Sequence, residues 1–177
     1  MATVKVVTGK VRLSYANLFE ARSSEEGQEA KYSVSLLIPK KDKATVEAIQ
    51  KAIAEVIRTE KDAKFGGKEK GLKLPLRDGD TERDGEEYAG HWFLNASSKT
   101  KPLILDEDKN PVLDAREVYS GCFARASINL YGFNAKGNKG VGAGLNAIQK
   151  LEDGEPLGST YTEATALEDF GDDDDLM

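Results

Sequence analysis

Residues 119–151 read YSGCFARASINLYGFNAKGNKGVGAGLNAIQKL, and this stretch decides the fold that we predict for the chain. Between residues 121 and 133 the side chains alternate with the two-residue period of a β-strand. A glycine-rich turn at 134–140 and a return strand at 141–145 complete a predicted β-hairpin. One face of the first strand is small or apolar and suits a packed interior: Cys122, Ala124, Ala126, Ile128 and Leu130.

The opposite face of this strand combines aromatic rings, a cation and polar groups. A strand with one face in water usually carries plain polar residues there. Flat rings beside a guanidinium suit unpaired nucleobases, because every base has a π-face and every linkage carries a phosphate. Cross-strand packing of the rings is an alternative interpretation that this pattern alone leaves open. The face consists of Phe123, Arg125, Ser127, Asn129, Tyr131 and Phe133.

The composition excludes several classes of protein. A chain of 177 residues suits one packed domain. The single cysteine, Cys122, and the single histidine, His91, exclude an intrachain disulfide, a thiolate metal site and a histidine-based metal cluster. The sequence contains no apolar run of membrane-spanning length and no signal-peptide core at its N-terminus. We therefore expect a soluble cytoplasmic protein without a metal ion or cofactor.

The acidic residues are concentrated at one end of the chain. Residues 161–177 hold seven acidic residues and no basic one, which leaves 24 of the 31 acidic residues against 25 basic ones elsewhere. This segregation predicts a domain at 1–158 and a flexible acidic tail at 159–177. Apolar side chains between the acids predict that the tail docks on partner proteins. The tail residues assigned to that role are Phe170, Asp172, Asp173, Asp174, Asp175, Leu176 and Met177.

The N-terminal part of the chain predicts two strands. Apolar positions change face after Gly9, so residues 4–15 predict one long strand with a bulge at Gly9 and with Tyr15 on the inner face. Lys10 and Arg12 would lie on the opposite face and line a groove. Alternation at 31–40 predicts the second strand.

A helix and a long polar segment follow. Asp42 can cap a helix that runs to about Glu60, with apolar residues on one stripe that packs against a barrel. Residues 61–90 then predict a flexible arm, first basic around Phe65 and later acidic.

The acidic cluster at 78–84 invites a metal-site interpretation. Counted from Asp80, the last ligand of a calcium loop would fall on His91, so that motif fails. A metal-dependent nuclease site built from Asp78, Asp80 and Glu82 remains an alternative, although such sites need acids on rigid elements.

A further strand at 91–96 places Trp92 on the core side and Phe93 on the exposed side. Lys99 and Lys101 follow it and repeat the combination of rings and cations. A short hairpin is expected at 103–113. Together the elements predict a mainly β protein, a small closed barrel of the OB type with one packed helix.

The glycine run GNKGVGAG lacks the Gly-Lys-Ser/Thr ending and the long following helix of a nucleotide-binding P-loop. We interpret it instead as a hairpin tip, on which Lys136 and Lys139 close over a bound strand.

Three stretches of the chain are distinctive: LPLRDGD, YAGHWFLNAS and YSGCFARASINLYGFNAKGNKGVGAGLNAIQKLEDGEPLG. In these stretches, and over most of residues 1–160, the sequence resembles a known family, the OB-fold single-stranded-DNA-binding proteins of tailed bacteriophages, formerly a domain of unknown function. The resemblance implies sequence-nonspecific binding of single-stranded DNA in phage DNA replication, recombination or repair. The tail is similar to those that recruit replication or recombination proteins, although it ends in Leu176 and Met177 rather than in an aromatic residue.

We therefore predict a non-enzymatic protein that coats single-stranded DNA in the cytoplasm of an infected bacterial host. An RNA-binding regulator on the same barrel is a further alternative, and the sequence leaves open whether the protein forms a homodimer. The rings assigned to base stacking are Phe123, Tyr131, Phe133, Phe93 and Trp92. The cations assigned to phosphate binding are Arg125, Lys99, Lys101, Lys136, Lys139, Lys10 and Arg12.

Overall fold

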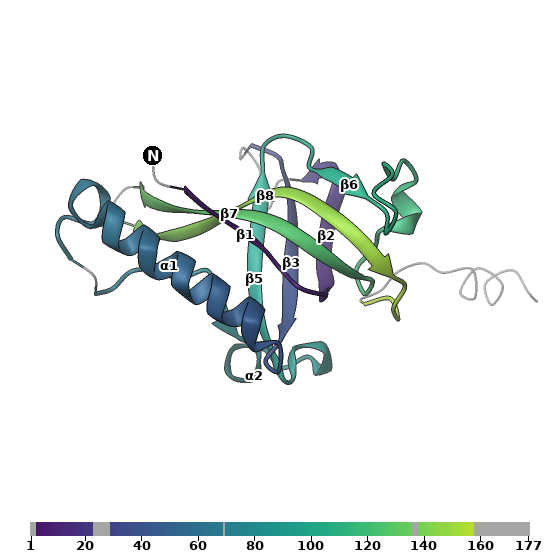
Figure 1. The fold of residues 1–177 in the computed structure, drawn as a ribbon, viewed down its shortest axis with the longest axis horizontal. Helices are drawn as coiled ribbons and strands as arrows, with labels where there is room; N and C mark the ends of the chain where they lie inside the picture. The colour runs from purple at the N-terminus through teal and green to yellow at the C-terminus, as the bar shows by residue number, and fades with distance from the viewer. Residues whose placement is uncertain (1–2, 23–28, 69, 136–137, 158–177) are drawn as a thin grey trace, which may run out of the picture.

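A computed structural model of the chain describes residues 3–22, 29–68, 70–135 and 138–157. Strands dominate it, and one long helix packs beside them (Figure 1). The strands are β1 (Thr3–Val7), β2 (Val11–Arg22), β3 (Lys31–Pro39), β4 (Leu76–Asp78), β5 (His91–Ser98), β6 (Leu103–Leu105), β7 (Phe123–Ala135) and β8 (Asn138–Glu152). The helices are α1 (Lys43–Lys64), the short α2 (Gly79–Glu82) and two 3₁₀ turns, η1 (Glu86–Tyr88) and η2 (Ala115–Glu117).

Five strands close into a barrel in the order β2-β3-β5-β8-β7, because β7 pairs with both β8 and β2. All of these pairs are antiparallel except β5 with β8, which are parallel where Ser97 lies opposite Gly144. A five-stranded barrel with this order is an OB-like fold, as predicted. β1 extends the sheet beside β7, β6 extends it beside β8, and β4 pairs with β5.

The core fills the barrel and the space between the barrel and α1. The small and apolar face of β7 points inward as predicted, since each of its residues from Cys122 to Leu130 on that face is at most 1% exposed. The predicted hairpin is also present, and it is longer than expected because β8 runs on to Glu152.

Helix α1 begins where predicted, because the Asp42 carboxylate accepts hydrogen bonds from the backbone N–H and the hydroxyl of Thr45. It continues four residues beyond the predicted end and lies along β1 and β7 (Figure 1). Gly9, between β1 and β2, packs against the first turn of this helix and donates its N–H to Thr45 Oγ1 at 2.9 Å. A Cβ at position 9 would be 2.7 Å from Asp42 Oδ2, so the close approach requires glycine.

The predicted bulge lies elsewhere than expected. The chain divides into β1 and β2 around Gly9, and the register shift in β2 falls between Ser14 and Asn17. Tyr15, within that shift, has a φ of +47° and is 71% exposed. The expectation that Tyr15 faces inward is therefore wrong, because this left-handed residue reverses the alternation of the strand.

The segment at 61–90 has more structure than the predicted arm. Its first residues belong to α1, and Phe65, which follows the helix, is fully buried. A Cβ on Gly132 of β7 would be 3.2 Å from Phe65 Cζ, so the ring packs directly on that glycine. β4, α2 and η1 occupy the second half of the segment.

The predicted hairpin at 103–113 is present, since Val112 donates to the Ile104 carbonyl and Leu105 bridges to Pro111. Within the part of the chain that the structure describes, no helix is both long enough and apolar enough to cross a membrane.

Candidate nucleic-acid interface

Tyr131 lies on the outer face of β7, opposite Gly142 of β8. A Cβ on Gly142 would be 2.9 Å from both Cζ and Oη of the ring, and one on Gly144 would be 3.9 Å from Cε1. The ring therefore covers two glycines of the neighbouring strand, and its half-exposed state leaves ring surface open to solvent. A flat ring supported on backbone in this way can accept a stacked base.

The surface beside Tyr131 continues across four strands of the barrel. Ser97 on β5 lies opposite Gly144 on β8, and Asn95 and Ser33 occupy neighbouring outward positions. These side chains are small and polar, so no large group projects from the sheet here and the surface can form hydrogen bonds. We call it the open face, and it consists of Ser33, Asn95, Ser97, Asn129, Tyr131, Gly142 and Gly144. Ser35, opposite Asn95, is buried.

A cavity of about 260 Å³ lies at the β2 side of the open face. The exposed ring of Tyr15 forms part of its rim, and Arg83 and Tyr88 contribute from the segment that precedes β5. Non-glycine residues with positive φ are uncommon and concentrate at functional positions. The lining residues are Tyr15, Ser33, Val34, Ser35, Arg83, Tyr88, Phe93 and Asn95.

One side of this cavity rests on a small second core outside the barrel, formed by Leu37, Tyr88 and Phe93. The rings of Tyr88 and Phe93 meet edge to face at a centroid distance of 5.5 Å. Burial raises the pKa of the Tyr88 hydroxyl, so Tyr88 stays neutral at physiological pH.

Phe93 is 1% exposed, so the expectation that it is the exposed ring of β5 is wrong. The guanidinium carbons of Arg77 and Arg83 lie 5.4 and 4.7 Å from its ring centre, and Tyr88 covers its edge. A base could stack on Phe93 only if these groups moved away. Trp92 packs against the main core as predicted, but it remains partly exposed.

The other predicted rings are separated along β7. Phe133 is half-buried and lies close to Tyr131, opposite Gly140. Phe123 is eight residues from Tyr131, which corresponds to roughly 27 Å of strand. The structure thus brings Phe133 and Tyr131 together and places Phe123 at the far end of the hairpin.

The cations near Phe123 have partners within the protein. The Lys10 ammonium lies 5.1 Å from the Phe123 ring centre and pairs with Glu152. Arg12 lies 5.8 Å from the same ring and donates to the carbonyl oxygens of Gly121 and Glu155. Arg125 is exposed and donates through Nε to the carbonyl oxygen of Thr8.

Lys99 and Lys101 lie in the turn after β5, next to the end of the open face. Lys99 is exposed and lies 3.4 Å from a carboxylate oxygen of Glu29. The Lys101 ammonium lies 5.1 Å from the Phe19 ring centre. Both therefore keep exposed charge close to Ser97.

Lys139 lies at the hairpin tip, as predicted, but on the side of the hairpin away from Tyr131, and its contact with a bound strand stays a prediction. Lys139 lies opposite Asn134 on the face of the hairpin that packs towards α1, and its ammonium is next to Gly66. In that position it complements the negative end of the helix rather than the open face. Lys136 lies outside the described residues.

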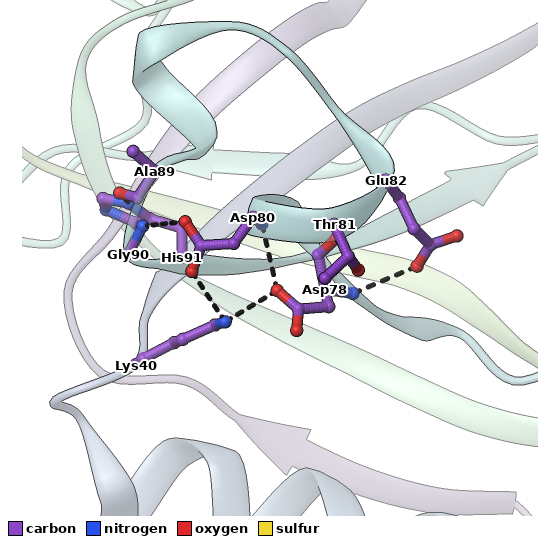
Figure 2. Close-up of polar contacts among 8 residues, drawn as sticks. All are labelled: Lys40, Asp78, Asp80, Thr81, Glu82, Ala89, Gly90 and His91. Carbon is purple, nitrogen blue, oxygen red and sulfur yellow. Dashed lines mark hydrogen bonds and ion pairs between the residues drawn. The ribbon is translucent and has the colours of Figure 1, made fainter.

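Three carboxylates of the acidic cluster at 78–84 pair with cations of the protein, and Figure 2 shows Lys40 with Asp78 and Asp80. Lys40 Nζ donates to Asp78 Oδ1 at 2.6 Å and to Asp80 Oδ2 at 2.8 Å, while Arg77 pairs with Glu82. The hydrogen bond from Lys40 lowers the pKa of Asp78 and that of Asp80, and the bond to Arg77 does the same for Glu82. Among the described residues there is no cluster of side chains that could hold a metal ion.

The tail residues assigned to partner binding lie outside the described residues. The last described residue, Leu157, packs against the second core of Leu37, Tyr88 and Phe93, and its N–H donates to the Ser120 carbonyl. The chain therefore leaves the domain close to the cavity.

Sequence analysis missed the residues that build the cavity, namely Tyr15, Arg83, Tyr88 and Asn95. Asn95 carried a usable signal, because it alternates with the buried Leu94 and Ala96 on β5. Arg83 and Tyr88 carried no such signal, since only the tertiary fold brings their segment onto the sheet.

An OB-like barrel with a polar open face and an aromatic-rimmed cavity defines a class of oligonucleotide-binding domains. Comparison with known proteins shows to which family within that class the chain belongs. A family model described as the single-stranded-DNA-binding protein of Enterobacter phage Enc34 matches residues 4–177, and the chain belongs to this family.

Individual proteins resemble this chain over most of its length. Protein p50 of Acyrthosiphon pisum secondary endosymbiont phage 1 is 36% identical over 96% of this chain and 94% of its own. The solved structure of the Enc34 protein in complex with single-stranded DNA is 31% identical, with a TM-score of 0.75 over 88% of this chain and 89% of the other. Bacteriophage T7 gp2.5, a single-stranded-DNA-binding protein, shares the fold at 15% identity, with a TM-score of 0.65 over 92% of this chain and 97% of the other.

Proposed function

We propose that this protein binds single-stranded DNA without sequence specificity along the open face, between the Tyr131 ring and the cavity at Tyr15. The observation that carries the proposal is the continuous surface of small side chains across β3, β5, β8 and β7, with the half-exposed Tyr131 ring at one end and the exposed Tyr15 ring at the other. A base can stack on each ring, and the small polar residues between them leave room for the backbone of the strand. Membership of the Enc34 family supports the same reading.

Phosphate neutralisation is assigned to the exposed cations that border this face. Arg83 lies at the cavity, Lys99 and Lys101 lie at the end of β5, and Arg125 lies further along β7. Lys10 and Arg12 lie beside Phe123 at the far end of the hairpin, and Lys139 lies on the side towards α1, so we assign these three cations smaller roles. Each phosphate contact contributes roughly −0.7 to the slope of log affinity against log salt concentration for a single strand.

Fluorescence anisotropy of labelled oligo-dT, compared with oligo-U and with duplex DNA at two salt concentrations, tests the proposal. We expect the tightest binding to oligo-dT, with an affinity that falls as salt rises. Equal binding to duplex DNA would contradict stacking on unpaired bases, and preference for oligo-U would favour the RNA-binding alternative.

We also propose that the protein is not an enzyme. The carboxylates of the nuclease alternative are paired with Lys40 and Arg77, which opposes the binding of a catalytic metal ion. When the labelled strand is incubated with the protein and magnesium or manganese, its length should remain unchanged. Cleavage that chelation abolishes would establish the nuclease activity instead.

The acidic tail at 159–177 is assigned two roles: competition with DNA for the open face, and docking of replication or recombination proteins in the host cytoplasm. Competition is supported by position, since Leu157 packs beside the cavity. A flexible segment of 19 residues has a root-mean-square reach of roughly 25 Å, enough to return across the face.

Deletion of residues 159–177 should therefore tighten binding of oligo-dT at low salt and have little effect at high salt, where charge is screened. The affinity of the full chain and that of the truncated chain, measured across a salt series, provide the comparison. A full-length variant with Asp172–Asp175 changed to asparagine keeps the length of the tail and removes four of its charges. If charge causes the competition, this variant should behave like the deletion. Identical affinities for all three proteins at low salt would contradict competition.

A further inference from the structure

Lys40 lies between two parts of the molecule that the sequence separates widely. It follows β3 directly and precedes the N-cap of α1, whereas its carboxylate partners, Asp78 and Asp80, belong to the segment that leads into β5. Figure 2 shows its ammonium between the two carboxylates. The Lys40 backbone N–H also donates to the Gly90 carbonyl at 2.9 Å.

These contacts fix both ends of residues 78–90. Asp78 caps α2 by accepting the Asp80 N–H at 2.9 Å, and the second oxygen of Asp80 accepts the Gly90 N–H at 2.9 Å. Lys40 therefore bridges the first residues of the segment, and Asp80 ties them to its last residue. The segment is held as a closed loop.

This loop carries side chains that build the cavity. Arg83 and Tyr88 line it, and Arg83 lies 4.7 Å from the Phe93 ring centre. The Lys40 side chain itself is not a lining residue, and its ammonium is occupied by the two carboxylates and lies 5.1 Å from the Trp92 ring centre.

We propose that Lys40 is a positioning residue for DNA binding: it neutralises Asp78 and Asp80 and thereby holds the 78–90 loop so that Arg83 stays at the cavity. This inference rests on the proposed function of the open face. Without the ammonium, the Asp78 and Asp80 carboxylates, which the hydrogen bond from the Asp80 N–H to Asp78 keeps close together, repel each other. This repulsion loosens residues 79–90, whereas Asp78 stays paired with Trp92 of β5.

The inference gives Lys40 an effect on binding that depends on Arg83. We expect Lys40→Met to weaken oligo-dT binding by roughly 5-fold or more in the otherwise unchanged protein, and to have little further effect in an Arg83→Ala background. Lys40→Arg should retain most of the affinity. Lys41→Met removes the same charge from the exposed neighbouring residue and is the matched control, with only a small effect.

A double-mutant cycle with oligo-dT measures this coupling. Additive effects of Lys40→Met and Arg83→Ala would overturn the inference, because they would mean that Lys40 acts on DNA independently. If the unchanged protein failed to bind oligo-dT at all, the proposed function would fail instead, so the two failures are distinguishable.

A second readout does not depend on DNA. In the free protein, residues 80–86 are already exposed, so Lys40→Met should act by loosening the loop and should speed trypsin cleavage after Arg83, whereas Lys41→Met should not. Unchanged cleavage would overturn the inference.

Asp80→Ala provides a test from the other side of the bridge, should Lys40→Met fail to fold. Removal of an acidic residue near a DNA site tightens binding if only charge matters. Anchoring gives the opposite result, a weaker affinity, because both the Lys40 and the Gly90 contacts are lost. Asp84→Ala, in the same loop, should equal or exceed the affinity of the unchanged protein. Tighter binding by Asp80→Ala would overturn the inference.

Discussion

Replacement of Tyr131 by leucine should weaken oligo-dT binding by roughly 5- to 140-fold at every salt concentration, which corresponds to about 1–3 kcal/mol for one stacked base. Leucine keeps apolar contact with Gly142 and Gly144 but has no flat surface for a base. The slope of log affinity against log salt should stay unchanged, because no phosphate contact is removed. Anisotropy titrations across a salt series measure both quantities.

Tyr131→Phe is the matched control, since it keeps the ring and removes only the hydroxyl, and it should bind nearly as well as the unchanged protein. Gly142→Ala tests the support of the ring, because the added Cβ would lie 2.9 Å from the ring atoms and displace them. Normal binding by Tyr131→Leu would remove Tyr131 from the interface.

Replacement of Phe65 by alanine should lower the free energy of unfolding by about 3–5 kcal/mol, because the ring is fully buried and leaves a cavity behind. Phe65 fills the space between the end of α1 and Gly132, so this loss should fall on the contact between the helix and the β7–β8 hairpin. Chemical denaturation followed by circular dichroism measures the change.

Phe19→Ala serves as the comparison, since Phe19 is only partly buried beside Lys101 and should cost clearly less. A small effect of Phe65→Ala, equal to that of Phe19→Ala, would mean that the end of α1 contributes little to the stability of the domain.

Local patterns in the sequence were enough to predict the barrel. The alternation along β7 is unambiguous because its inner positions are all small or apolar, and the Asp42 cap marks the start of α1. Each of these signals lies within a few residues of the structure that it specifies. For the same reason the outward, half-exposed position of Tyr131 and Phe133 could be predicted.

The cavity could not be predicted, because it depends on contacts between distant segments. Phe93 alternates like an exposed residue, but Arg77, Arg83 and Tyr88 cover it from a different part of the chain. The burial of Phe65 also depends on a distant segment, because glycines and lysines surround it in sequence and its packing partner is Gly132. Period and composition carry no information about either contact.

Tyr15 shows a third reason. Its left-handed backbone shifts the register of β2, and no residue in the local sequence marks the change, since glycine or asparagine would be the usual choice there. An expectation based on strict alternation therefore placed the ring on the wrong side of the strand.

The backbone at Tyr15 also has a thermodynamic consequence. An L-residue in the left-handed region costs about 1–2 kcal/mol, a penalty that glycine would avoid. The domain thus gives up some folding free energy at this position in order to hold an aromatic ring in solvent. Glycine at position 15 would recover that free energy but remove the ring, so the stability of the domain and the proposed stacking on Tyr15 make opposite demands on this position.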